Sequence, residues 1–259
     1  MAKVYGECCI CGLERELSFE HVPPRAAFNN SRVFLVRGEH LFGGTGLIDT
    51  DSPDARQQQR GAGAYTLCIP CNNTTGGWYG AAYADWARQA ALLLEASRGE
   101  VVLAYPFKIF PLRVVKQLVS MFMSANGPEF RRKAPYLEKF VMDKRQTGLP
   151  SDIRLYAGYN HGRFSRTTGI VGLVDDGTVH GLSEITYRPF AFVMALASPP
   201  PNRQMIDITS FAEAHIDDPR VLYLSMPVLN VRSQFPADYR SEDEILRAAA
   251  AHAKRPSAT

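Results

Sequence analysis

Two Cys-x-x-Cys pairs constrain this chain more than any other feature of its sequence. The first pair comprises Cys8 and Cys11, and the second comprises Cys68 and Cys71. Each pair can direct two thiolates toward one point, and together they supply the four sulfur ligands of a tetrahedral zinc site. Because four thiolates leave no coordination position open, the predicted zinc ion is structural. The alternative is two unrelated pairs of buried or redox-active thiols.

The remaining cysteine, Cys9, lies inside the first pair and has no partner at a ligand spacing. The chain has five cysteines, and an odd number argues against a framework of disulfides. No apolar run reaches the roughly 18 residues that a membrane-spanning helix needs, and the first residues lack the apolar stretch of a secretory signal. We therefore expect a cytoplasmic protein without a membrane segment, in a compartment where structural disulfides are rare.

The pattern of apolar residues predicts an α+β protein. Residues 79–93 carry apolar side chains at helical spacing, and residues 101–110 have the composition of a strand. Pro111 can begin a helix, and a further helix is expected over residues 128–142. Beyond residue 150 the sequence favours strands over residues 153–159, 168–174, 179–187, 190–197 and 221–229, and a helix over residues 241–253.

These elements suggest two units. Residues 1–98 would form the N-terminal zinc module, and residues 99–259 a larger mixed domain with an antiparallel sheet. Residues 37–63 are rich in Gly, Asp, Ser and Gln, which predicts a long loop inside the first unit. The second unit contains no motif of known chemistry, so a regulatory ligand or a partner protein bound there is an open alternative.

Positive charge is concentrated in residues 108–166, which contain 12 basic and 4 acidic side chains, although the whole chain has a net charge of only +3. An excess of this size predicts contact with the phosphates of a nucleic acid. Within this segment, the candidates for that contact are Arg113, Lys116, Arg131, Arg132 and Lys133. Arg113 and Lys116 are expected on the solvent face of the helix that begins at Pro111. The alternative is a solvated helix face that binds nothing.

A Glu20-His21 dipeptide lies between the two cysteine pairs, and Asn72 directly follows the second pair. Histidine suits general-base catalysis because its pKa lies near the working pH. Carboxylate and amide oxygens are the hard ligands that Mg²⁺ and Mn²⁺ prefer. Arg25 could contact a phosphate, or it could have only a structural role. The alternative for Glu20 and His21 is a salt bridge or a supporting position near the zinc.

The order of these motifs resembles that of the zinc-containing HNH nucleases, which have a ββα-metal or treble-clef fold. The residues that match are Cys8, Cys11, Glu20, His21, Cys68, Cys71 and Asn72. The resemblance implies a β-hairpin joined to a helix by zinc, with His21 as general base and with Glu20 and Asn72 holding a catalytic Mg²⁺ or Mn²⁺ ion. It further implies an endonuclease that hydrolyses phosphodiester bonds in DNA.

The sequence departs from the family pattern in two respects. Aspartate is commoner than glutamate at the position of Glu20, and the asparagine that usually precedes the second cysteine pair is missing. Residues 62–65, Ala-Gly-Ala-Tyr, stand in its place. In the family this asparagine tethers the loop of the hairpin. Its absence favours the alternative function, a catalytically silent zinc module that binds nucleic acid or protein.

Overall fold

The computed structural model describes residues 3–35, 56–162, 164–175, 178–231, 235–240 and 242–253. Most of the loop predicted over residues 37–63 therefore lies outside the described residues. Within the described ranges, no helix is both long enough and apolar enough to cross a membrane.

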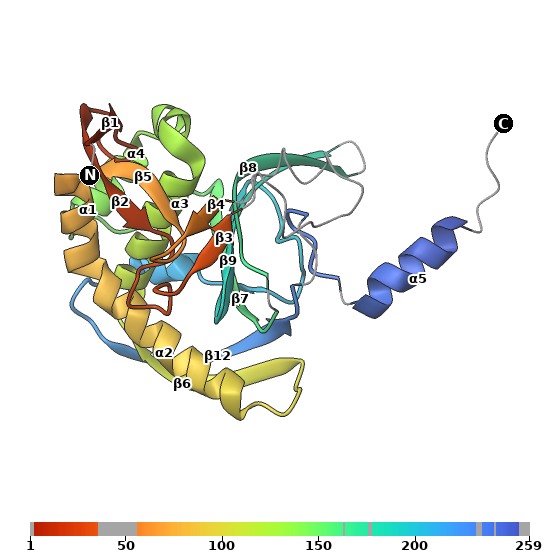
Figure 1. Cartoon of the computed structure of the whole chain (residues 1–259). Helices are drawn as coiled ribbons and strands as arrows, with labels where there is room; N and C mark the ends of the chain where they lie inside the picture. The colour runs from red at the N-terminus through yellow and green to blue at the C-terminus, as the bar shows by residue number, and fades with distance from the viewer. Residues whose placement is uncertain are drawn as a thin grey trace.

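A three-stranded antiparallel sheet with the strand order β1-β2-β5 begins the fold (Figure 1). Its strands are β1 (Val4–Glu7), β2 (Glu14–His21) and β5 (Gly63–Cys68). The turn between β1 and β2 carries Cys8 and Cys11, and the backbone N–H of Gly12 donates to the carbonyl oxygen of Cys8 at 2.8 Å. Gly12 has a φ of 69°, a left-handed conformation that glycine adopts without steric cost. The hairpin that the sequence predicts is confirmed.

One helical segment follows β5 directly and runs from Ile69 to Ala96. It comprises α1 (Ile69–Thr75), a π-helical turn η2 (Gly76–Gly80) and α2 (Ala81–Ala96). The helical periodicity of residues 79–93 is confirmed, because Tyr79, Tyr83 and Trp86 are buried on one side of this segment. These three rings form part of the core.

A short two-stranded antiparallel ribbon branches from the first sheet. It consists of β3 (Val33–Leu35) and β4 (Arg56–Gln58), with Phe34 paired opposite Gln57. β4 corrects the prediction of an unbroken loop over residues 37–63, since three residues of that range form a strand. The strand was not recognised because its three residues are all polar and show no alternation of apolar and polar side chains.

A seven-stranded sheet makes up most of the rest of the chain. Six strands follow the order β6-β12-β7-β10-β9-β8, and β11 pairs with β7. The strands are β6 (Val102–Ile109), β7 (Ile153–Asn160), β8 (Arg166–Asp175), β9 (Thr178–Tyr187), β10 (Phe190–Leu196), β11 (Ile206–Asp207) and β12 (Arg220–Leu229). The described pairings are antiparallel except for the short contact of β12 with β7. The predicted α+β class with an antiparallel-rich sheet is confirmed.

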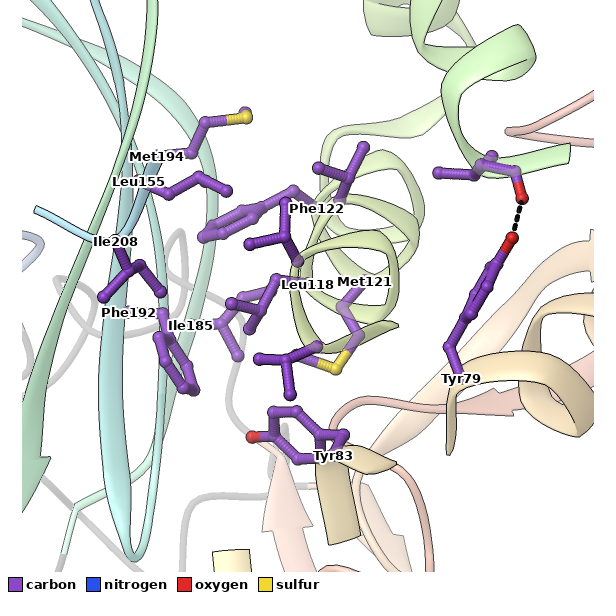
Figure 2. Close-up of a cluster of buried hydrophobic side chains, with 14 of the residues drawn as sticks. Tyr79, Tyr83, Leu118, Met121, Phe122, Leu155, Ile185, Phe192, Met194 and Ile208 are labelled. Carbon is purple, nitrogen blue, oxygen red and sulfur yellow. Dashed lines mark hydrogen bonds between the residues drawn. The ribbon is translucent and has the colours of Figure 1, made fainter. Parts of the chain in front are cut away.

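The long helix α3 (Pro111–Lys133) lies between this sheet and the η2–α2 segment, as Figure 2 shows. Its buried residues Leu118 and Phe122 face Phe192 and other apolar side chains of the sheet. On the other side, the Tyr79 hydroxyl donates a hydrogen bond of 2.9 Å to the carbonyl oxygen of Val141 in α4 (Tyr136–Met142). The sheet, the η2–α2 segment and α4 all pack against α3. Apolar residues therefore lie on most sides of this helix rather than along a single stripe.

The helix expected over residues 128–142 is divided in the structure. Gly127 has a φ of 76° and is followed by Pro128, so α3 bends at this point and then continues to Lys133. Pro128 cannot donate the backbone hydrogen bond of a continuous helix, which explains the bend. α4 then begins after a short break, at Tyr136.

Lys116 corrects a second prediction. It was expected on the solvent face of α3, but its side chain is fully buried. Its ammonium group donates to the backbone carbonyl oxygens of Phe140 and Asp143. Burial lowers its pKa to about 8, although Asp143 opposes this shift. The aliphatic part of a lysine side chain packs readily in an apolar core when its ammonium group reaches carbonyl acceptors. The helical spacing of residues in the sequence does not distinguish such a buried lysine from one on the solvent face.

One continuous core extends across both predicted units. Trp86 of α2 packs against Phe190 of β10, with ring centroids 4.3 Å apart, and also contacts Phe107 of β6. The boundary predicted at residue 98 falls in the exposed turn between α2 and β6 and stays a prediction. The chain ends with η3 (Thr209–Glu213), β12 and α5 (Glu242–Ala253), the last of which extends away from the body of the molecule (Figure 1).

Candidate active site and metal centre

The four paired cysteines meet where the β1–β2 turn contacts the start of α1. Their Sγ atoms all lie within 4.8 Å of one another, and those of Cys11 and Cys68 are 3.8 Å apart. A tetrahedral site with Zn–S bonds of about 2.3 Å requires sulfur atoms about 3.8 Å apart. The cluster could therefore hold a metal ion such as zinc, and the predicted convergence of the two pairs is confirmed.

The four thiols influence one another's ionisation. Hydrogen bonding with Cys71 lowers the pKa of Cys8, and the same contact raises the pKa of Cys71. Burial raises the pKa of Cys11. Four thiolates at this spacing therefore require a cation among them. Cys9 is buried outside the cluster, and its burial raises the pKa of its thiol to about 12, as expected for an inert thiol.

Glu20 is the second-last residue of β2, and its side chain is buried. It is 6% exposed, and its carboxyl group has no hydrogen bond and no ion pair among the described residues. Burial raises the pKa of its carboxyl group to about 8. An isolated ionised carboxylate is costly to bury, so this group requires either a proton or a nearby cation.

His21 is the last residue of β2, and its ring orientation is fixed by two contacts. The ring packs edge to face against Phe19, with centroids 4.9 Å apart. Its Nε2 lies 3.0 Å from the backbone carbonyl oxygen of Arg60. Because a carbonyl oxygen can only accept, Nε2 carries the proton and Nδ1 keeps its lone pair. Burial, and additionally the positive charge of Arg25, lowers the pKa of His21 despite the bond to Arg60, which favours a neutral ring that can accept a proton.

Asn72, in the first turns of α1, is directed toward β2. Its Nδ2 donates to Ser18 Oγ at 3.0 Å and to the carbonyl oxygen of Phe19 at 3.3 Å. The rings of Phe19 and His21 pack together on one face of β2, and consecutive side chains of a strand point to opposite faces, so Glu20 faces away from the His21 ring. The structure therefore brings Asn72 to Ser18 and Phe19, where the pairing of β2 with β5 shifts register, and no hydrogen bond among the described residues joins Asn72 to Glu20 or His21.

Asn29 is a site residue that the sequence did not reveal. Its buried side chain accepts a hydrogen bond from the Ala62 N–H at 2.6 Å and donates to the carbonyl oxygens of Ala62 and Pro23, both at 2.7 Å. It ties the segment after His21 to the segment before β5. Residues 62–65 lack the asparagine that the resemblance implies, and these bonds join the same segment to a side chain 33 positions away. The only local signal was an Asn-Asn-Ser run among turn-forming residues.

Most cations predicted to contact DNA have partners within the chain. The ion pairs are Arg113 with Asp217, Arg131 with Glu138, and Arg132 with Glu7 and Glu129. Arg131 also donates to the carbonyl oxygen of Ile10 at 2.9 Å and so holds the first cysteine turn against α3. Lys133 and Arg25 are exposed. Burial excludes Lys116 from any such surface, and contact of the others with DNA stays a prediction.

No protein-family model, no curated protein and no solved structure matches this chain. The structure supports the coarser prediction, a module in which four clustered cysteines beside a hairpin and a helix could hold a metal ion, and membership of the HNH nucleases stays a prediction.

Proposed function

We propose that this chain is a divalent-metal-dependent endonuclease that hydrolyses phosphodiester bonds in DNA and contains a structural zinc ion. The observation that carries the proposal is the hydrogen bond from Asn72 to Ser18, residues 54 positions apart. This bond brings α1 against the strand that ends in Glu20 and His21. A carboxylate, an imidazole and an amide thereby lie on or against the end of β2, with the imidazole on the face opposite the carboxylate, in the order that the resemblance to HNH nucleases implies.

Cys8, Cys11, Cys68 and Cys71 would hold the zinc ion. Four thiolates leave no position for water or substrate, so the ion would have a structural role. Cys71 is joined directly to Asn72 in the chain. Zinc at this cluster would therefore fix the position of Asn72 relative to β2.

Glu20 and Asn72 would hold the catalytic Mg²⁺ or Mn²⁺ ion. Glu20 offers a buried carboxylate that has no partner in the described part of the chain, and Asn72 uses its Nδ2 on β2, which leaves its Oδ1 as a ligand. Two protein ligands leave coordination positions for water and phosphate, as is common for Mg²⁺. When bound, such an ion stabilises negative charge on the scissile phosphate and on the leaving oxygen.

His21 would act as the general base. Its Nδ1 accepts a proton from the attacking water, while the bond from Nε2 to Arg60 keeps the ring in the required tautomer. The water oxygen bonds to phosphorus as the opposite P–O bond breaks, with the electron pair leaving on that oxygen. Arg25, whose charge acts on His21, would contact the phosphate.

A catalytically silent zinc module that binds nucleic acid or protein is the second candidate. It is favoured by the position of the His21 ring, which packs on Phe19 across the strand from Glu20. The Asn29 tether favours the catalytic function, because it fixes the segment that follows His21.

The test is incubation of the purified full chain with supercoiled plasmid, linear duplex DNA, branched DNA and RNA. Each substrate is combined with Mg²⁺, Mn²⁺ or a chelator. The proposal predicts conversion of plasmid to nicked and linear forms in Mg²⁺ or Mn²⁺ and none in chelator. Protein that cleaves no substrate in either metal would favour the silent module.

A further inference from the structure

A groove opens where the end of α3 meets the start of α4 and the large sheet. Its volume is about 430 Å³, and its walls come from these two helices, from β8, from the end of β10 and from the residue before β7. All of its lining residues belong to the described part of the chain. Ligand pockets usually have volumes of roughly 300–1,000 Å³, so the groove has the size of a site for one small molecule.

Two irregularities of the backbone face each other at this groove. α3 bends at Gly127, which has a φ of 76°, and the pairing of β8 with β9 shifts register between Thr168 and Val171. Asn126 joins the two, because its Oδ1 accepts a hydrogen bond of 2.6 Å from the N–H of Ile170. Bulges of this kind are frequent beside functional sites, where they redirect a side chain. Here the bulge brings Ile170 to the wall of the groove.

Apolar side chains form one part of the lining. Phe130 is buried, Leu196 is half-buried and Ile170 is exposed. Tyr136, the first residue of α4, adds an aromatic ring that is 40% exposed. Hydrophobic and aromatic side chains bury the apolar part of a ligand, and aromatic rings interact favourably with other rings beyond the area that they bury. This part of the groove therefore suits an aromatic or branched apolar group.

Opposite charges form the other part of the lining. Lys133 and Asp152 are exposed, and neither has an ion pair among the described residues. Burial, and additionally the charge of Asp152, raises the pKa of Tyr136, so this carboxylate lies near the phenol ring. The remaining charged residue of the groove, Glu129, is paired with Arg132. Within the described residues, one cation and one anion thus line the groove without an ion pair of their own.

We infer that this groove binds a free amino acid with an aromatic or branched apolar side chain, a ligand outside the proposed nuclease reaction. The α-carboxylate pairs with Lys133, the α-ammonium group pairs with Asp152, and the side chain packs against Phe130 and Ile170. A zwitterion complements both charges at once. Phosphate sites, by contrast, commonly use arginine or several backbone N–H groups, whereas this groove offers one lysine beside two carboxylates. Such a role for Lys133 is an alternative to its predicted contact with DNA.

The experiment is calorimetric titration of the full chain with L-phenylalanine and with L-leucine. Wild-type protein should show saturable binding. Lys133→Met and Asp152→Asn should each lower the affinity about tenfold or more, because each removes a charge-assisted hydrogen bond to the ligand. The matched control is Lys139→Met, which removes an exposed lysine of α4 that does not line the groove and should bind like wild type. Thermal stability should be unchanged in all three variants, since the substituted side chains are exposed.

Two analogues test the two charges separately. N-acetyl-L-phenylalanine lacks the ammonium group and phenethylamine lacks the carboxylate, so each should bind wild type about tenfold more weakly than L-phenylalanine or worse. Asp152→Asn should not weaken N-acetyl-L-phenylalanine further. Three results would overturn the inference: no saturable binding of either amino acid, unchanged affinity in Lys133→Met and Asp152→Asn, or tighter binding of a nucleoside monophosphate than of L-phenylalanine.

Discussion

Asn29 binds both backbone polar groups of Ala62 with its side-chain amide, although the two residues lie 33 positions apart. The same carbonyl oxygen of Ala62 accepts a hydrogen bond from the N–H of Val22, the residue after His21. The end of the strand that carries His21 is thus fixed by a side chain from outside the sheet.

Replacement of Asn29 by alanine should therefore weaken both the fold and the site. Three hydrogen bonds are lost, and the N–H of half-buried Ala62 loses its acceptor, so the free energy of unfolding should fall by about 2–3 kcal/mol. Cleavage by the folded fraction should also slow, because the segment after His21 is no longer held. Denaturant unfolding and plasmid cleavage measure the two effects, with the exposed neighbour Asn30→Ala as control. Full cleavage by folded Asn29→Ala would limit the residue to a structural role.

The cysteine cluster should contain one zinc ion per chain. Cys68→Ser should reduce zinc content and thermal stability together, since the energy of metal binding contributes to folding. Cys9→Ala should keep its zinc, because Cys9 lies outside the cluster. Elemental analysis and thermal unfolding of both variants test this expectation. Wild-type protein prepared without chelator and found free of zinc would contradict it.

Glu20→Gln should stabilise the protein in the absence of added Mg²⁺ or Mn²⁺. The pKa of Glu20 is about 8 in the folded chain against 4.5 for the ordinary group, so the folded state binds more protons between these values. Wild-type stability should accordingly fall, relative to Glu20→Gln, as the pH rises from 4.5 to 8. Thermal unfolding across this range is the measurement. Parallel pH profiles of the two proteins would show that Glu20 is not buried as described.

Lys116→Met should destabilise the protein without changing its interaction with DNA. The carbonyl oxygens of Phe140 and Asp143 lose their donor, at an expected cost of about 1–3 kcal/mol. DNA affinity and its salt dependence should equal those of wild type, because the ammonium group is buried. Lys133→Met, at an exposed position of the same helix, is the matched control for stability. A reduced salt dependence in folded Lys116→Met would restore the lysine to the list of phosphate contacts.

The sequence predicted those features whose signals are local or periodic. The strands after residue 150 and the helix around Trp86 followed from apolar spacing, and the convergence of the cysteines followed from the geometry of each Cys-x-x-Cys turn. The position of Asn72 at the start of α1 was expected from the resemblance, which implies that the residue after the second cysteine pair lies at the beginning of a helix.

Other features depend on contacts between distant segments and have no such signal. Asn29 acts through bonds between its side chain and a distant backbone, which leave no periodic trace. Lys116 is buried because α4 offers carbonyl acceptors that only the folded chain brings near. The excess of basic residues in 108–166 does not show that Arg132 pairs with Glu7 and that Arg131 donates to the carbonyl oxygen of Ile10, because both partners lie far away in the sequence.

The central claim, that His21 is the base of a nuclease, is tested most directly by the cleavage rate of His21→Gln, which retains an N–H donor for the Arg60 carbonyl. The account predicts a rate about 10²–10⁴-fold below wild type, with zinc content and thermal stability unchanged and no rescue by excess Mn²⁺. Asn72→Ala, by comparison, should be partly rescued by Mn²⁺. Cleavage by His21→Gln at the wild-type rate, or a loss of cleavage in proportion to lost zinc and stability, would contradict the claim.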